Sequence, residues 1–183
     1  KPIIGCEVYV AQRGRTDRVH ELDAESRHLV LLCKNETGYR NLSYMVSMGF
    51  VEGFYIKPRI DMELLRAHSE GLIALSACLA GEIPRRLRNG DYEGAKAHAL
   101  EMRELFGEDS YYLELQDHGL PEQKKVAAGI LRIHEETGIP LFSVADKGEL
   151  YGREAGSDIV PPNEKTGHPA GLSGLSVPCG IRS

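Results

Sequence analysis

Four ionisable side chains lie in or just after apolar runs of strand length. Cys78, His118 and Asp146 each follow such a run, and Glu7 lies inside the first one. In α/β folds the loops that follow parallel strands converge on one edge of the sheet, so these side chains are expected to gather there. Thiolate, imidazole and carboxylate groups together suit zinc or a similar divalent ion. The sequence therefore suggests a metal site at the carboxyl ends of the strands.

Each of these residues also has an ordinary structural role to set against the metal site. Taken alone, Cys78 is typical of a small buried hydrophobe, His118 of a loop residue, and Asp146 of a helix N-cap or turn. Glu7 is less ordinary, because a carboxylate inside an apolar strand is costly without a partner. His28 begins a strand instead of ending one, so its position alone does not select it.

Apolar runs alternate with segments of helical period, which predicts an α/β fold with mainly parallel strands and helices packed on the sheet. The expected strands are residues 2–10, 28–33, 72–78, 111–116 and 139–144. Residues 12–27 are polar and charged, which predicts a surface loop.

The helices have recognisable ends in the sequence. Asp91 is a good N-cap for a helix over residues 92–106, and Gly107 can end that helix in the left-handed conformation. Pro121 suits the first position of a helix that continues to about residue 137. Two further helices are expected, one over residues 36–48 and a short one after Asp61.

Composition limits the classes of function. The 183 residues are 42% hydrophobic and 27% charged, with a formal net charge of −5. Duplex binding rests on clustered Lys and Arg, so DNA contact is expected to be weak or absent. A modest basic surface, more often simply solvated, is expected from a set of cationic side chains: Lys57, Arg59, Arg85, Arg86 and Arg88.

Neither a membrane span nor a disulfide framework is indicated. No apolar run approaches the ~20 residues that a membrane helix requires. The four cysteines form no CxxC pair, which favours reduced thiols and a cytoplasmic location.

The chain divides near Lys147. Residues 1–147 carry the alternating pattern, whereas residues 148–183 are rich in Gly, Pro and Ser and form an irregular tail of uncertain origin. The start, at Lys1 without an initiator Met, suggests a truncated piece.

Five stretches resemble the PHP domain of the alpha subunit of bacterial DNA polymerase III, a C-family replicative polymerase. These are KPIIGCEVYV (1–10), HLVLLCKNETGY (28–39), EGFYIKPRID (52–61), GLIALSACL (71–79) and LELQDHG (113–119). The resemblance covers residues 1 to about 146 in order. It implies a partial, distorted (βα) barrel in a chain whose parent catalyses nucleotide addition elsewhere.

The resemblance also implies a set of metal ligands. The family's barrel holds a multinuclear metal cluster; some members hydrolyse phosphodiesters as proofreading exonucleases, whereas in others the ligands have decayed. By this resemblance Glu7, His28, Cys78 and Asp146 align with metal ligands, and His118 is a further candidate. Zinc or manganese is the expected ion, with absence of any metal as the alternative.

The chain departs from the family's pattern in ways that argue against catalysis. The His-x-His and Asp-x-His elements of the family would lie before Lys1, and Gly148 stands where the closing element has a histidine. A phosphodiesterase that uses several metals needs more ligands than remain. We therefore expect a non-catalytic scaffold fragment, with a metal-dependent phosphoesterase and a fused or engineered binding module as alternatives.

Missing strands would leave the barrel open. An exposed sheet edge predicts self-association, coverage by the tail, or a covering partner such as the rest of the polymerase or the replisome. In the tail, residues 170–180 resemble a short segment of amidase-signature enzymes, but the Ser-Ser-Lys machinery of those enzymes has no counterpart here. No amidase chemistry is inferred.

Overall fold

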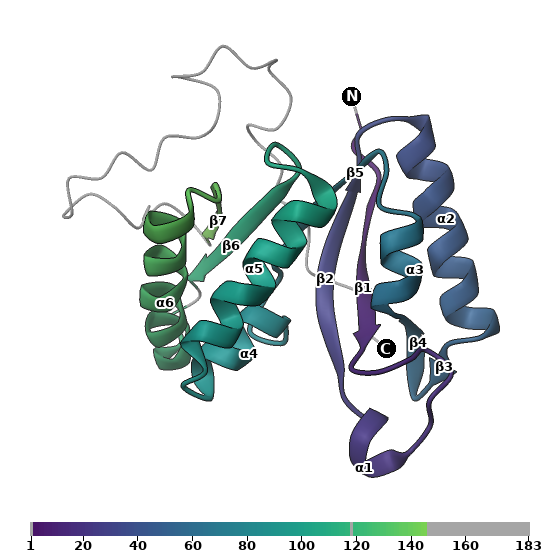
Figure 1. The fold of residues 1–183 in the computed structure, drawn as a ribbon, viewed down its shortest axis with the longest axis horizontal. Helices are drawn as coiled ribbons and strands as arrows, with labels where there is room; N and C mark the ends of the chain where they lie inside the picture. The colour runs from purple at the N-terminus through teal and green to yellow at the C-terminus, as the bar shows by residue number, and fades with distance from the viewer. Residues whose placement is uncertain (1, 118, 146–183) are drawn as a thin grey trace.

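A single mixed sheet forms the centre of the molecule in the computed structural model, which describes residues 2–117 and 119–145 (Figure 1). The strands are β1 (Gly5–Ala11), β2 (Ser26–Cys33), β3 (Phe54–Tyr55), β4 (Lys57–Ile60), β5 (Leu72–Leu75), β6 (Tyr111–Asp117) and β7 (Leu141–Ala145). Their order across the sheet is β3-β4-β1-β2-β5-β6-β7.

Most of the strands run in one direction. β1 is parallel to β4, and β5, β6 and β7 are parallel to one another. β2 is antiparallel to both β1 and β5, and β3 is antiparallel to β4. The expected α/β fold with mainly parallel strands is therefore confirmed, and in the described part of the chain β3 and β7 are the two outermost strands, without closure into a barrel.

Six helices connect and cover the described strands. They are α1 (His20–Asp23), α2 (Glu36–Val51), α3 (Met62–Ala67), α4 (Glu82–Arg88), α5 (Tyr92–Phe106) and α6 (Pro121–Thr137). The Asp91 carboxylate accepts from the Gly94 amide and caps α5, as expected of an N-cap. Gly138 ends α6 in the left-handed conformation.

The core lies on one face of the sheet because side chains alternate along each strand. Val8 and Val10 of β1 and Leu29 and Leu31 of β2 are buried on that face. They belong to one apolar cluster with buried side chains of α2, α3, α5 and α6. The residues between them in β1 and β2, including Glu7 and His28, consequently lie on the opposite face.

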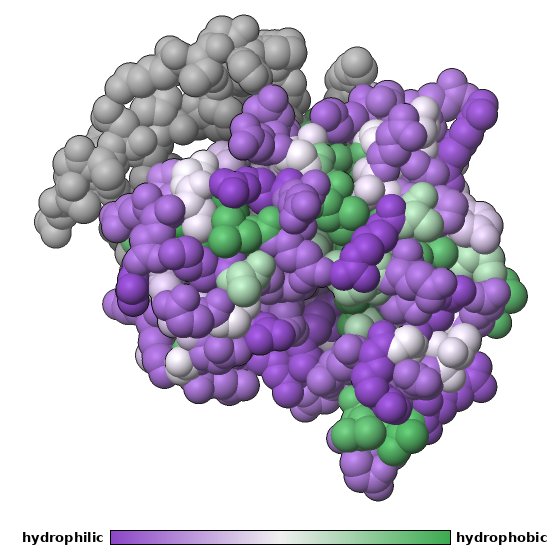
Figure 2. All heavy atoms as spheres, in the orientation of Figure 1, coloured by the Kyte–Doolittle hydropathy of each residue, from purple (hydrophilic) through white to green (hydrophobic). Residues whose placement is uncertain are grey.

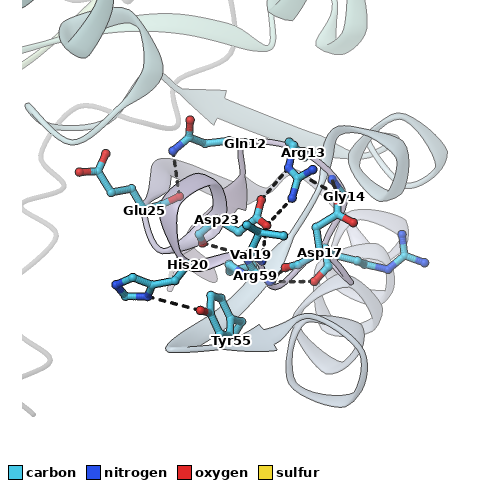
Figure 3. A network of polar contacts seen from close by, with 11 residues as sticks. Gln12, Arg13, Gly14, Asp17, Val19, His20, Asp23, Glu25, Tyr55 and Arg59 are labelled. Carbon is cyan, nitrogen blue, oxygen red and sulfur yellow. Dashed lines mark hydrogen bonds and ion pairs between the residues drawn. The ribbon is translucent and has the colours of Figure 1, made fainter.

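Arg59 ties the connection between β1 and β2 to the sheet (Figure 3). This β4 side chain is 1% exposed, and its guanidinium donates to the carbonyl oxygens of Gly53, Asp23, Arg15 and Asp17. Three of these carbonyls belong to the β1–β2 connection. That connection joins the strand of Glu7 to the strand of His28.

Several expected boundaries were wrong. Residues 12–27 are not only a surface loop, since they contain α1 and the start of β2. β5 ends at Leu75, three residues before the expected end at Cys78. Gly107 has a positive φ of 91° but a ψ of 158°, so it ends α5 in an extended rather than left-handed helical conformation.

Candidate metal centre

Glu7 and His28 are brought together by the register of the first two strands. In the antiparallel pair β1–β2, Tyr9 lies opposite His28 and Glu7 lies opposite Val30. Directly opposed residues share a face, so Glu7 and His28 are diagonal neighbours on the face away from the core. The Glu7 Oε1 to His28 Nδ1 distance is 3.1 Å.

Cys78 reaches the same place from the loop after β5. Ala77 has a positive φ of 63°, a conformation that costs a non-glycine residue about 1 kcal/mol and turns the chain sharply before Cys78. The His28 amide donates to the Ala80 carbonyl, which fixes this loop against β2. The Cys78 Sγ to His28 Nδ1 distance is 3.5 Å.

The three side chains converge on one point. The carboxylate and the sulfur both approach the same imidazole nitrogen, and the ligand atoms of Glu7, His28 and Cys78 all lie within 4.8 Å of one another. In a catalytic Cys-His-Glu triad the thiol and the carboxylate would contact opposite nitrogens of the ring. The arrangement therefore fits the coordination sphere of one ion better than a nucleophile with its base.

The charges of Glu7 and His28 depend on each other. The pKa of His28 is raised from 6.5 to about 9 by its hydrogen bonds to Cys78 and Glu7. The pKa of Glu7 is lowered by the hydrogen bond to His28 and by the positive charges of His28 and Lys57. In the metal-free protein the imidazole is thus protonated near neutral pH, and a bound metal would have to displace that proton.

A row of side chains backs the centre. The Tyr9 ring contacts the His28 ring edge-on, with centroids 5.0 Å apart, and the Lys57 ammonium lies 4.3 Å from the centroid of the Tyr9 ring. Sequence reasoning did not identify Tyr9 as part of the site. Its position two residues after Glu7, in a strand of period two, was the available signal.

A groove of about 500 Å³ opens beside His28. Lys57 on one side and Arg85 and Arg88 on the other supply positive charge, while Glu25 pairs with Arg85. The groove therefore carries an excess of cations in a chain whose net charge is negative.

The expected basic surface is only partly correct. Lys57, Arg85 and Arg88 line the groove, but Arg59 is buried beneath the sheet surface and donates all its bonds internally. Arg86 is held by Glu82 and Asp91.

Of the five predicted site residues, the structure brings three together. Glu7, His28 and Cys78 form the single group of potential metal ligands found within residues 2–117 and 119–145. His118 and Asp146 lie outside the described residues. No helix in the part of the chain that the structure describes is long and apolar enough to span a membrane.

Comparison with known proteins gives the family. The model of the PHP domain matches residues 1–118. DNA polymerase III subunit alpha of Treponema pallidum (strain Nichols) is 51% identical over 147 residues, covering 80% of this chain and 13% of that protein. The same subunit is 46% identical in Thermus aquaticus, over 80% of this chain and 12% of that protein.

The Borreliella burgdorferi subunit extends the match, with 44% identity over 162 residues, or 87% of this chain and 14% of that protein. The chain thus spans about one eighth of the length of these relatives. Because the family model covers more than half of the sequence, this chain belongs to the PHP domain family, and over most of its length it is similar to DNA polymerase III alpha subunits.

Proposed function

We propose that this chain is the PHP portion of a bacterial replicative polymerase alpha subunit and acts there as a non-catalytic scaffold that holds one metal ion. The observation that carries the proposal is the convergence of Glu7, His28 and Cys78 on one point. Residues donating oxygen, nitrogen and sulfur to one point suit a single divalent cation. DNA replication, in the cytoplasm and beside the remaining polymerase and replisome, is the cellular setting that the relatives' name supports.

Zinc is the ion that this donor set favours. Thiolate and imidazole ligands prefer zinc, whereas manganese prefers oxygen-rich sites. A structural zinc takes four protein ligands. We assign the fourth position to Asp146, with His118 as the alternative, because both follow strands of the same direction as β5.

The scaffold role follows from the number of ligands. Hydrolysis of a phosphodiester in a multi-metal site requires ions that activate water and also stabilise the leaving oxygen. The described donors meet at one point and provide for one ion. When bound, that ion would cross-link β1, β2 and the loop after β5. The cross-link would tie the β1–β2 side of the sheet to the β5 side.

A hydrolysis assay tests the scaffold role. The purified chain is incubated with single-stranded DNA and with bis(4-nitrophenyl) phosphate, in the presence of zinc or manganese. The expected rate equals that of the Cys78→Ser variant under the same conditions. A metal-dependent rate that Cys78→Ser abolishes would contradict a non-catalytic scaffold.

The groove supports a second candidate, a metal-dependent phosphoesterase. Lys57, Arg85 and Arg88 could neutralise a phosphodiester next to His28. For this function Lys57→Met should raise the KM of a hydrolysed phosphodiester while leaving zinc content unchanged. Equal hydrolysis of the phosphodiester by Lys57→Met and by the unchanged chain would remove this candidate function.

A further inference from the structure

A second pocket, of about 290 Å³, opens between β2 and the helices α4 and α5, and it shares Arg27 and His28 of β2 with the groove. The buried Arg27 lines it from the core face of β2, and its neighbour His28 contributes to the lining while its imidazole meets Glu7 and Cys78. Helices α4 and α5 form the facing wall. In Figure 2, which has the orientation of Figure 1, largely hydrophilic residues cover the surface between α4 and β2.

The carboxylates in this pocket are already paired. Glu82 accepts from Arg27 through one oxygen and from Arg86 through the other, at 2.8 and 2.6 Å. Arg27 is 8% exposed and donates to Glu82 through Nε, and within the described residues its Nη2 atom makes no hydrogen bond, so Nη2 remains available as a donor.

The carboxylate that α5 contributes to the pocket is also paired. Glu101 contacts Arg66 through one oxygen and the His98 ring through the other. Burial lowers the pKa of His98, so this ring adds no positive charge near neutral pH. The pocket therefore has occupied acceptors and an unused cationic donor.

Tyr111 supplies a second donor. This first residue of β6 lines the pocket and is 1% exposed, and within the described part of the chain its hydroxyl has no hydrogen-bond partner. Burial raises the pKa of Tyr111, so the hydroxyl stays protonated. The Tyr111 hydroxyl is not one of the buried unsatisfied polar atoms of the described residues, so it is open to the pocket and can donate to a bound acceptor.

We propose that this pocket binds a small oxyanion, a phosphate or a carboxylate on a compact apolar body. The Arg27 guanidinium and the Tyr111 hydroxyl would donate to the oxyanion, as such groups do in other anion sites. Val10, Leu29 and Met102 provide apolar contact for the body. The volume is close to the lower bound of the roughly 300–1,000 Å³ of small-molecule pockets, which suits a compact ligand.

This inference does not depend on the proposed scaffold function, and an experiment separates the two sites. The metal-free 183-residue chain is titrated with inorganic phosphate, citrate and deoxyadenosine 5′-monophosphate, with deoxyadenosine as the anion-free comparison. Binding is followed by amide chemical shifts. We expect saturable binding of at least one anion and none of deoxyadenosine, and the phosphate and citrate titrations identify the preferred oxyanion.

Matched variants locate the binding. Tyr111→Phe deletes one hydroxyl and should weaken binding about tenfold, the value of one hydrogen bond to a charged group. Tyr112→Phe is the control, because the neighbouring Tyr112 hydroxyl donates to the Asp109 carbonyl at an exposed position. Arg27→Gln should also weaken binding, although Arg27 lines the groove as well, whereas Lys57→Met, which alters the groove alone, should leave binding unchanged.

Three results would overturn the inference. The first is that no anion saturates the chain up to about 10 mM, a concentration beyond the range of a specific site. The second is that Tyr111→Phe binds the anion as tightly as the unchanged chain. The third is that Lys57→Met loses binding, which would assign the anion to the groove.

Discussion

Replacing Arg59 tests whether one buried guanidinium holds the connection between the two strands of the metal centre. The Arg59 side chain is nearly inaccessible and donates to four carbonyl oxygens. Those of Arg15, Asp17 and Asp23 belong to the connection between β1 and β2 (Figure 3). Arg59→Met keeps much of the apolar stem and removes all of these donors.

The loss in the free energy of unfolding depends on which carbonyl oxygens find another hydrogen-bond donor after the substitution. The Gly53 carbonyl keeps the bond from the residue 59 amide, and the Arg15 and Asp17 carbonyls are part-buried and within reach of water. The Asp23 carbonyl is left buried without a donor, at a cost of about 1–3 kcal/mol. The other hydrogen bonds from the guanidinium are also lost. In total we expect the free energy of unfolding to fall by about 3 kcal/mol, a large part of the 5–15 kcal/mol typical of a domain.

Urea unfolding followed by circular dichroism measures this loss. The control is Arg40→Met, which removes an arginine that is 75% exposed and pairs with Glu36 within α2. That variant should leave the unfolding midpoint nearly unchanged. A loss below about 1 kcal/mol for Arg59→Met would refute the role given to these bonds. Amide shifts of Glu7 and His28 should move in Arg59→Met and stay in place in Arg40→Met.

Three further predictions concern pH, close packing and helix capping. The thiol and carboxylate beside His28 raise its pKa from 6.5 to about 9. The protonated imidazole should therefore stabilise the folded metal-free chain fully below pH 6.5, and this contribution to the free energy of unfolding should be lost as pH rises to about 9. In a plot of the urea-unfolding midpoint against pH, His28→Gln should remove the fall over that range. Gly38→Ala places a methyl 1.9 Å from the Gly71 carbonyl oxygen and should prevent folding. Gly49→Ala, in the same helix, meets only ordinary van der Waals contacts. In thermal denaturation that control should be as stable as the unchanged chain or up to about 1 kcal/mol more stable. Asp91→Ala should cost about 1 kcal/mol in the same assay, and an unchanged midpoint would remove its capping role.

The elements that the sequence predicted best are those with both a periodic face and a chemical end signal. The helix over residues 92–106 has its expected bounds because Asp91 caps it, and Pro121 begins the next helix as expected. The missed helix α4 has no such signals, since Gly81 at its N-cap makes no side-chain bond and three arginines interrupt its apolar pattern. β3 has two residues, too few for a period.

The metal centre shows which part of the site the sequence could supply. Cys78 follows a strand, which the edge argument selects. His28 was not selected because strand direction is a tertiary property: β2 is antiparallel to its neighbours, so its beginning lies at the edge where β5 ends. Only the family resemblance pointed to His28. Arg59 illustrates the converse limit, since a cation in a polar stretch cannot be recognised as buried without its carbonyl partners.

Residues 148–183 and the expected domain boundary at residue 147 lie outside the described residues, so that division stays a prediction. Self-association also stays a prediction. Phe54 of the outermost strand β3 and the adjacent Ile56 are exposed apolar residues at one edge of the sheet. Sedimentation of Phe54→Lys against the unchanged chain would show whether that edge forms a contact.

Elemental analysis of the purified chain tests the metal centre most directly. Zinc, manganese and iron are measured per molecule in the unchanged chain, in Cys78→Ser and in Cys33→Ser, which alters a half-buried cysteine outside the group of ligands. About one zinc per chain is expected, retained in Cys33→Ser and lost in Cys78→Ser. Absence of metal from all three proteins, or equal metal in Cys78→Ser, would contradict this expectation.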